Sequence, residues 1–224
     1  MSKQRGNAVL IDSPVAMTRK LVKAVGLASA SESEWTRQYD REGVQVFTRP
    51  VAGSAYQEFR GEMVVDSDIG PILSMLWTTE DMPYWMEGCL KAELVKSISH
   101  CERMIYIVNT THGLMEPRDI VLHNRIEQDP ATLVVRYTMD KVDYPLDTGY
   151  IEVAKMNGIV ELKPLAAGRT HVVYQAHFDA GGYLPSWLIS LAIKKFPAIT
   201  LTAGRRLQQR RRYPDFPGIK NFPR

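Results

Sequence analysis

The 224-residue chain has few of the features that mark metal-binding, nucleotide-binding and membrane-spanning proteins. Its two cysteines, Cys89 and Cys101, form no metal-ligand spacing, and its five histidines include no His-x-x-x-His pair. No run approaches the roughly 20 apolar residues of a membrane span. No glycine-rich segment opens a helix after a strand, so a phosphate-cradling loop is not expected. We therefore expect no metal and no cofactor.

Acidic residues are nearly absent from the end of the chain. Residues 194–224 hold nine basic side chains against one acid, Asp215, although the formal net charge of the whole chain is only +3. This asymmetry favours a polyanionic partner, either nucleic acid or an anionic membrane, but cations also suit the negative pole of a helix dipole. Because aromatic residues are not interleaved on a strand surface, we expect no nucleic acid. The residues assigned to transient membrane docking are Arg205, Arg206, Arg210, Arg211 and Arg212.

The N-terminal region only partly matches an export signal. Residues 17–23 include three basic side chains, and residues 24–30 are apolar or small. The apolar stretch is short and contains Gly26 and Ser29, and sixteen residues precede the whole segment. We expect an amphipathic helix and a cytoplasmic protein, with an atypical export signal as the alternative. The predicted organisation is an N-terminal arm and helix (1–30), a ligand-binding domain (31–213) and a C-terminal tail (214–224).

Alternating apolar residues between positions 44 and 179 predict a series of strands, and tight turns between them favour antiparallel pairing. An apolar stripe over Pro185–Arg212 predicts a long helix, which Pro197 is expected to kink or interrupt. The fold class is therefore α+β, with a curved antiparallel sheet wrapped around a long C-terminal helix. Where sheet and helix stand apart, an internal hydrophobic tunnel is expected between them.

Five stretches carry a family resemblance: Gly43–Arg49, Phe59–Gly61, the helical segment ending at Trp85, Pro117–Asp119 and Gly182–Leu188. In this order the chain resembles the START (steroidogenic acute regulatory protein-related lipid transfer) family. The resemblance implies a helix-grip, Bet v 1-like fold and a non-catalytic, monomeric protein. Such a protein binds and transports one lipid or other hydrophobic small molecule without a metal, nucleotide or catalytic residue.

The chain departs from the family at two positions. Sterol-type members resemble one another in an acid–arginine pair inside the tunnel, and the matching residues here are Ile105 and Asn124. Phosphatidylcholine-binding members place an arginine near a tryptophan, but Asp81–Trp85 holds no cation. A charged headgroup would lose its partner at either place, and a buried unpaired charge is costly.

Strand alternation then selects the residues of the tunnel wall. If Ile105 and Asn124 face inward, so do Ile107 and Leu122, although plain core packing is an alternative for the aliphatic residues. Leu114 and Met115 are apolar residues in a loop, either a lid tip or an ordinary packed loop. The predicted ligand-binding residues are Trp85, Ile105, Ile107, Leu122, Asn124, Leu114, Met115, Trp187, Leu188 and Leu191.

Two further hypotheses concern polar residues. Arg118 and Asp119 stand at a strand start and are predicted to form a structural ion pair. An alternative function is that of a polyketide cyclase or aromatase on the same architecture, in which Asn124, Tyr137 or a histidine orients a reactive carbonyl. We see no nucleophile–base pair in the sequence, so we expect a protein that is not an enzyme.

Overall fold

One large sheet forms the body of the protein. The computed structural model describes residues 34–110, 116–182 and 184–221, without the side chains of residues 186 and 187. Neighbouring strands pair antiparallel in the order β1-β2-β3-β10-β9-β7-β6-β5-β4, and β8 pairs parallel with β6. The strands are β1 (Thr36–Arg41), β2 (Val44–Arg49), β3 (Glu58–Val65), β4 (Cys89–Ser99), β5 (Glu102–Asn109), β6 (Arg118–Gln128), β7 (Val135–Lys141), β8 (Ile151–Glu152), β9 (Lys155–Leu165) and β10 (Arg169–Asp179).

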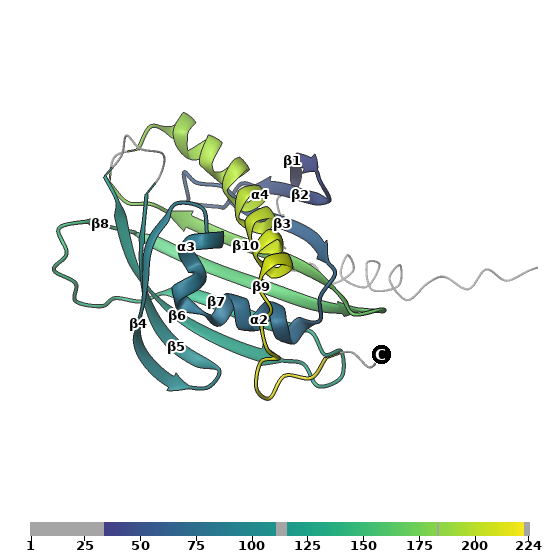
Figure 1. Ribbon diagram of the computed structural model, residues 1–224. Helices are drawn as coiled ribbons and strands as arrows, with labels where there is room; N and C mark the ends of the chain where they lie inside the picture. The colour runs from purple at the N-terminus through teal and green to yellow at the C-terminus, as the bar shows by residue number, and fades with distance from the viewer. Residues whose placement is uncertain (1–33, 111–115, 183, 222–224) are drawn as a thin grey trace, which may run out of the picture. The chain divides into compact units, whose positions relative to one another are not determined.

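The helices lie against one face of this sheet (Figure 1). They are α2 (Ile69–Trp77), the 3-10 turn η1 (Thr79–Asp81), α3 (Met82–Trp85) and α4 (Ser186–Arg210). The predicted α+β fold of an antiparallel sheet with a long C-terminal helix is confirmed. Although Pro197 lies inside α4, the helix continues through it without interruption. No helix in the described part of the chain is long and apolar enough to cross a membrane.

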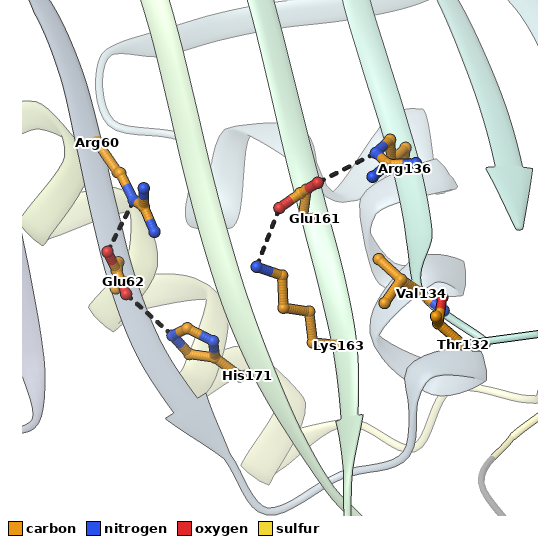
Figure 2. Close-up of polar contacts among 8 residues, drawn as sticks. All are labelled: Arg60, Glu62, Thr132, Val134, Arg136, Glu161, Lys163 and His171. Atoms are coloured by element: carbon orange, nitrogen blue, oxygen red, sulfur yellow. Dashed lines mark hydrogen bonds and ion pairs between the residues drawn. The ribbon is translucent and has the colours of Figure 1, made fainter. Parts of the chain in front are cut away.

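The two faces of the sheet differ in polarity because side chains alternate along each strand. The face away from the helices carries a ladder of ion pairs (Figure 2). Glu62 binds both Arg60 at 2.7 Å and His171 at 3.1 Å, and Glu161 binds Arg136 at 3.1 Å. The inner face carries buried apolar residues such as Phe59 and Met63. The larger apolar cluster therefore lies on the inner face, under the helices, and a smaller one around Tyr106, Val108 and Val121 lies on the other face.

Gly61 sets how closely α4 approaches the sheet. A Cβ atom at this position of β3 would lie 2.7 Å from Cδ1 of Leu201 and 3.2 Å from Cβ of Pro197. We expect Gly61→Ala to push the helix outward and to lower the free energy of unfolding by about 1–3 kcal/mol, measured by denaturant titration. The control Gly204→Ala adds a methyl on α4 that meets only the flexible end of Met75 at 3.4 Å. This variant should not destabilise the protein, because alanine is the better helix former.

The segment that follows α4 packs onto the domain. Phe216 is only 5% exposed, and its ring lies edge-on to that of Trp77, with centroids 5.7 Å apart. Further along, the Asn221 side chain accepts a hydrogen bond from the Gly70 backbone at 2.9 Å. Residues 214–221 of the predicted tail are therefore held against α2, at one end of the sheet.

Candidate ligand-binding site

The space between the inner face and α4 contains an apolar pocket of about 130 Å³, here called the outer pocket. Strands β5, β6 and β10 form one wall and the first half of α4 forms the other. Polar side chains of the lining, such as Glu87, Asn109 and Lys195, are few. Its apolar lining includes Ile107, Ile120, Leu122, Ala176, Leu188, Leu191, Ala192 and Phe196.

A smaller inner pocket, of about 40 Å³, lies beside α2, α3 and the second half of α4. Its lining includes Trp85, Tyr137 and Leu201. Met86 and Tyr174 line both pockets, so their side chains stand between the two. The structure thus divides the space expected for one tunnel into two neighbouring pockets.

The walls of both pockets are rich in methionine. A cavity of about 150 Å³ accommodates a molecule the size of benzene, so a lipid requires the walls to move. Methionine is unbranched and adopts many rotamers, which lets it repack around a guest. Five of the ten methionines of the chain line the pockets: Met63, Met75, Met86, Met139 and Met156.

A buried polar cluster lies at the inner-pocket end of the sheet. Arg103 on β5 is directly opposite Asn124 on β6, and the Asn124 amide donates to the Tyr137 hydroxyl at 2.5 Å. The Arg103 guanidinium donates to the Trp77 carbonyl at 2.5 Å and to the Thr79 hydroxyl at 2.9 Å. It also stacks on the Trp77 ring, with its central carbon 3.9 Å from the ring centroid.

Several atoms in this region lack hydrogen-bond partners among the described residues: Nε and Nη2 of Arg103, Oδ1 of Asn124 and Nε1 of Trp85. Burial lowers the pKa of Arg103. Burial raises the pKa of Tyr137, and the neighbouring Arg103 guanidinium opposes that rise. Unsatisfied buried polar groups are rare in folded proteins, so this cluster is a candidate for contact with a polar ligand group.

The inward register predicted from strand alternation is confirmed for β5 and β6, where Ile105 lies opposite Leu122 and both are at most 1% exposed. Ile107 and Leu122 line the outer pocket, but Ile105 lines neither pocket and packs in the core. Asn124 also lines neither pocket and instead bonds to Tyr137, which lines the inner one.

The remaining predicted ligand residues come from the helices and one loop. Trp85 lines the inner pocket, and Leu188 and Leu191 line the outer pocket. Trp187 lies in the first turn of α4, but its side chain is outside the described part of the structure. Leu114 and Met115, the predicted lid tip, also lie outside the described residues.

The ion pair predicted between Arg118 and Asp119 is not formed, which corrects that expectation. Arg118 donates to the backbone carbonyl of Glu116 at 2.7 Å. Asp119 accepts hydrogen bonds from the hydroxyls of Tyr106, at 3.1 Å, and Thr148, at 2.5 Å. The physical reason is that adjacent residues of a strand point to opposite faces of the sheet. Both side chains are buried: Arg118 holds the backbone of Glu116, whereas Asp119 holds two hydroxyl side chains.

The arginines assigned to membrane docking differ in their surroundings. Arg205 donates to the Glu42 carbonyl at 2.9 Å, and Arg211 forms an ion pair with the buried Asp81. The others, Arg206, Arg210 and Arg212, are exposed near the end of α4. Within the described ranges no group of three or more His, Cys, Asp or Glu side chains is arranged to hold a metal ion.

The antiparallel sheet and the overlying α4, with two apolar pockets between them, define a helix-grip domain. The START domain model matches residues 18–200, and the chain belongs to this family. An uncharacterized protein of Pseudomonas aeruginosa is 28% identical over 197 residues, which cover 87% of this chain and 97% of that protein. The STAR-related lipid transfer protein (fragment 25–204) of Xanthomonas axonopodis is similar in structure, with a TM-score of 0.73 and 29% identity over 78% of this chain and 98% of that one.

The same fold also occurs in an enzyme. The Zhui aromatase/cyclase from Streptomyces sp. R1128 has a TM-score of 0.50 and 17% identity, covering 69% of this chain and 94% of that one. START domains are typically lipid binders. Because one fold supports different functions, the function of this chain has to be argued from its pockets.

Proposed function

We propose that this protein binds one hydrophobic molecule between the sheet and α4 and transfers it between membranes without changing it chemically. The observation that carries the proposal is the outer pocket, whose apolar walls come from both the sheet and the helix. Moving apolar ligand surface from water into such a site yields roughly 25 cal/mol per Å². This desolvation supplies the binding energy.

Entry of a ligand requires the pockets to merge and widen. Met86 and Tyr174 separate them, and the flexible Met86 side chain is the one that gives way most readily. The first half of α4 forms the outer wall and exposes Leu191 by 37%. A small outward movement of this half-helix would open the outer pocket, as lids do in many binding proteins.

Native mass spectrometry of the purified full chain, followed by solvent extraction, tests the proposal. We expect a population carrying one extra mass, which is released on unfolding and is recovered unchanged. The purified protein should also move a fluorescent lipid analogue from donor to acceptor vesicles. Absence of both a copurifying ligand and uptake of any apolar probe would overturn the proposal.

A pocket-filling substitution gives a sharper test. Ala192 on α4 lines the outer pocket, whereas Ser190 on the same helix is exposed and does not. We expect Ala192→Trp to compete with the ligand at a cost of about 1–3 kcal/mol of binding free energy, measured as reduced uptake of the fluorescent analogue. The matched control Ser190→Trp adds the same ring outside the pocket and should bind normally. Equal binding by both variants would place the ligand elsewhere.

The second candidate function is that of a cyclase or aromatase. The observation in its favour is the hydrogen-bonded pair of Asn124 and Tyr137, which can orient a carbonyl group beside the inner pocket. The extraction experiment separates the two functions. A carrier returns the ligand as it was bound, whereas an enzyme converts an added polyketide substrate in a manner that depends on Tyr137.

Transfer also requires contact with a membrane, and we place it at the exposed arginines that end α4, Arg206, Arg210 and Arg212. Each basic residue near an anionic surface contributes about 1 kcal/mol of attraction. Vesicles with anionic lipids should therefore bind the protein more strongly than neutral vesicles, and added salt should weaken that binding.

A further inference from the structure

Arg103 is a buried cation without an ionic partner among the described residues. Arg103 is only 5% exposed, and an arginine guanidinium stays protonated in proteins. The groups next to the guanidinium are the Trp77 carbonyl and the hydroxyls of Thr79 and Tyr137, and all three are neutral because burial keeps the phenol protonated. Such a charge is costly to bury unless something compensates it.

The acidic residues near Arg103 do not supply that compensation. Glu80 is exposed and forms no ion pair with Arg103, although its negative charge acts to raise the pKa of Arg103. The neighbouring Asp81 is committed to Arg211 and to the Tyr213 hydroxyl, which donates at 2.6 Å. No other carboxylate of the described chain lies within ion-pair distance of Arg103. Among the described residues, the positive charge therefore has no carboxylate partner.

The unsatisfied atoms around Arg103 are mostly donors. Arg103 has N–H groups to spare on Nε and Nη2. The indole N–H of Trp85, in the wall of the inner pocket, is a further unpaired donor. The one unsatisfied acceptor is Oδ1 of Asn124, and exchanging the oxygen and nitrogen of that amide would only turn it into another donor. A surplus of donors with a net positive charge selects a ligand group that accepts hydrogen bonds and is negative.

The cluster is adjacent to the inner pocket. Trp85 and Tyr137 line that pocket, and the Tyr137 hydroxyl is bonded to Asn124, which lies opposite Arg103 on the neighbouring strand. Arg103 itself lines neither pocket. A ligand in the inner pocket meets Trp85 and Tyr137, and its polar end would have to pass the Tyr137 hydroxyl to reach the guanidinium. A linear molecule in this orientation has its polar end at Arg103 and its apolar chain in the outer pocket.

The geometry points to a single-chain anionic amphiphile as the ligand, with its carboxylate or phosphate bound by Arg103. This inference rests on the proposed function and assigns the class of molecule carried. One chain is favoured over two because the pockets measure only about 130 and 40 Å³ before they widen. Nε and Nη2 of Arg103 present two N–H groups side by side, the geometry that binds a carboxylate or phosphate with two parallel hydrogen bonds.

Calorimetric titration of the delipidated full chain with four probes tests the inference: dodecanoate, dodecyl phosphate, dodecanol and inorganic phosphate. We expect one or both anionic amphiphiles to bind about 10- to 100-fold more tightly than dodecanol, and the comparison of the two identifies the preferred head. Inorganic phosphate alone should not bind measurably. Equal or tighter binding of dodecanol, or binding of inorganic phosphate as tightly as dodecyl phosphate, would overturn the inference while leaving the proposed function standing. If none of the amphiphiles binds, the inference fails, and the proposed function then depends on whether the fluorescent lipid analogue is still taken up.

Arg103→Met removes the charge and keeps the length of the side chain. It should abolish the preference for the anionic probes over dodecanol, whereas Arg103→Lys should restore part of the preference. The control Arg125→Met removes an exposed arginine from the other face of the sheet and should change neither. A merely structural arginine would lower binding of all amphiphiles alike. Should Arg103→Met not fold, the probe preference of the unmodified chain still decides the question.

Discussion

Between pH 8 and pH 12 the free energy of unfolding should fall by several kcal/mol, because buried acids of high pKa must stay protonated in the folded state. Burial raises the pKa of Tyr106 to about 12, aided by the nearby charge of Asp119. Burial also raises the pKa of Tyr213 to about 12, aided by its bond to Asp81. Burial raises the pKa of the Cys89 thiol to about 11, so this group behaves in the same way.

The sign follows from the direction of these shifts. A group whose pKa is higher in the folded than in the unfolded chain contributes stability that is present below the unfolded pKa and lost as the pH rises through the folded pKa. For Cys89 the loss extends from about pH 9 to 11, and for the two tyrosines from about pH 10 to 12. Tyr106 and Cys89, each 7% exposed, account for about 2–3 kcal/mol apiece.

Denaturant titration at a series of pH values measures this profile. Tyr106→Phe forfeits its hydrogen bond to Asp119 at neutral pH, at a cost of about 1 kcal/mol, but should make the alkaline loss smaller. Tyr144→Phe, which removes a phenol that is 40% exposed, should leave the profile as it is. A free energy of unfolding that stays level to pH 12 would contradict the expectation.

The period-two pattern of β5 and β6 was enough to predict which residues face the helices. Ile105, Ile107 and Leu122 follow directly from it, and so does Asn124. Arg103 has the same parity as Ile105 and was missed, because a charged residue beside a hairpin is normally assigned to solvent. Extending the alternation by one step would have placed it inward. Its neutral partners, such as Trp77 from α2, arrive only through the tertiary fold.

Two other features of the structure are only weakly indicated by the sequence. The edge strand β1 was not predicted, because Thr36–Arg41 is polar and partly exposed on both faces and shows no alternation. The partner of Asp119 could not be read from the sequence either, since the Thr148 hydroxyl reaches it from a residue 29 positions away. Long-range pairing of polar groups depends on topology, whereas burial of aliphatic residues is already encoded in local periodicity.

Removal of the Asp81 carboxylate should loosen the segment after α4. Asp81 is 7% exposed and accepts hydrogen bonds from Arg211 and Tyr213, which lie at the start of this segment. Hydrogen bonds to a charged group contribute more than neutral ones. We therefore expect Asp81→Ala to lower the free energy of unfolding by about 2–4 kcal/mol, measured by denaturant titration.

The substitution should also speed amide hydrogen exchange in residues 213–219 more than in the sheet. Gln128 holds the far end of the segment by accepting from the Lys220 backbone at 2.9 Å, so we expect local opening rather than loss of the fold. Opening would move Phe216 off Trp77, whose other contacts include the Arg103 guanidinium, and would let water reach the polar cluster. Arg212→Ala removes an exposed neighbouring charge and should not change exchange. If Asp81→Ala and Arg212→Ala exchanged alike, Asp81 would not be what anchors the segment.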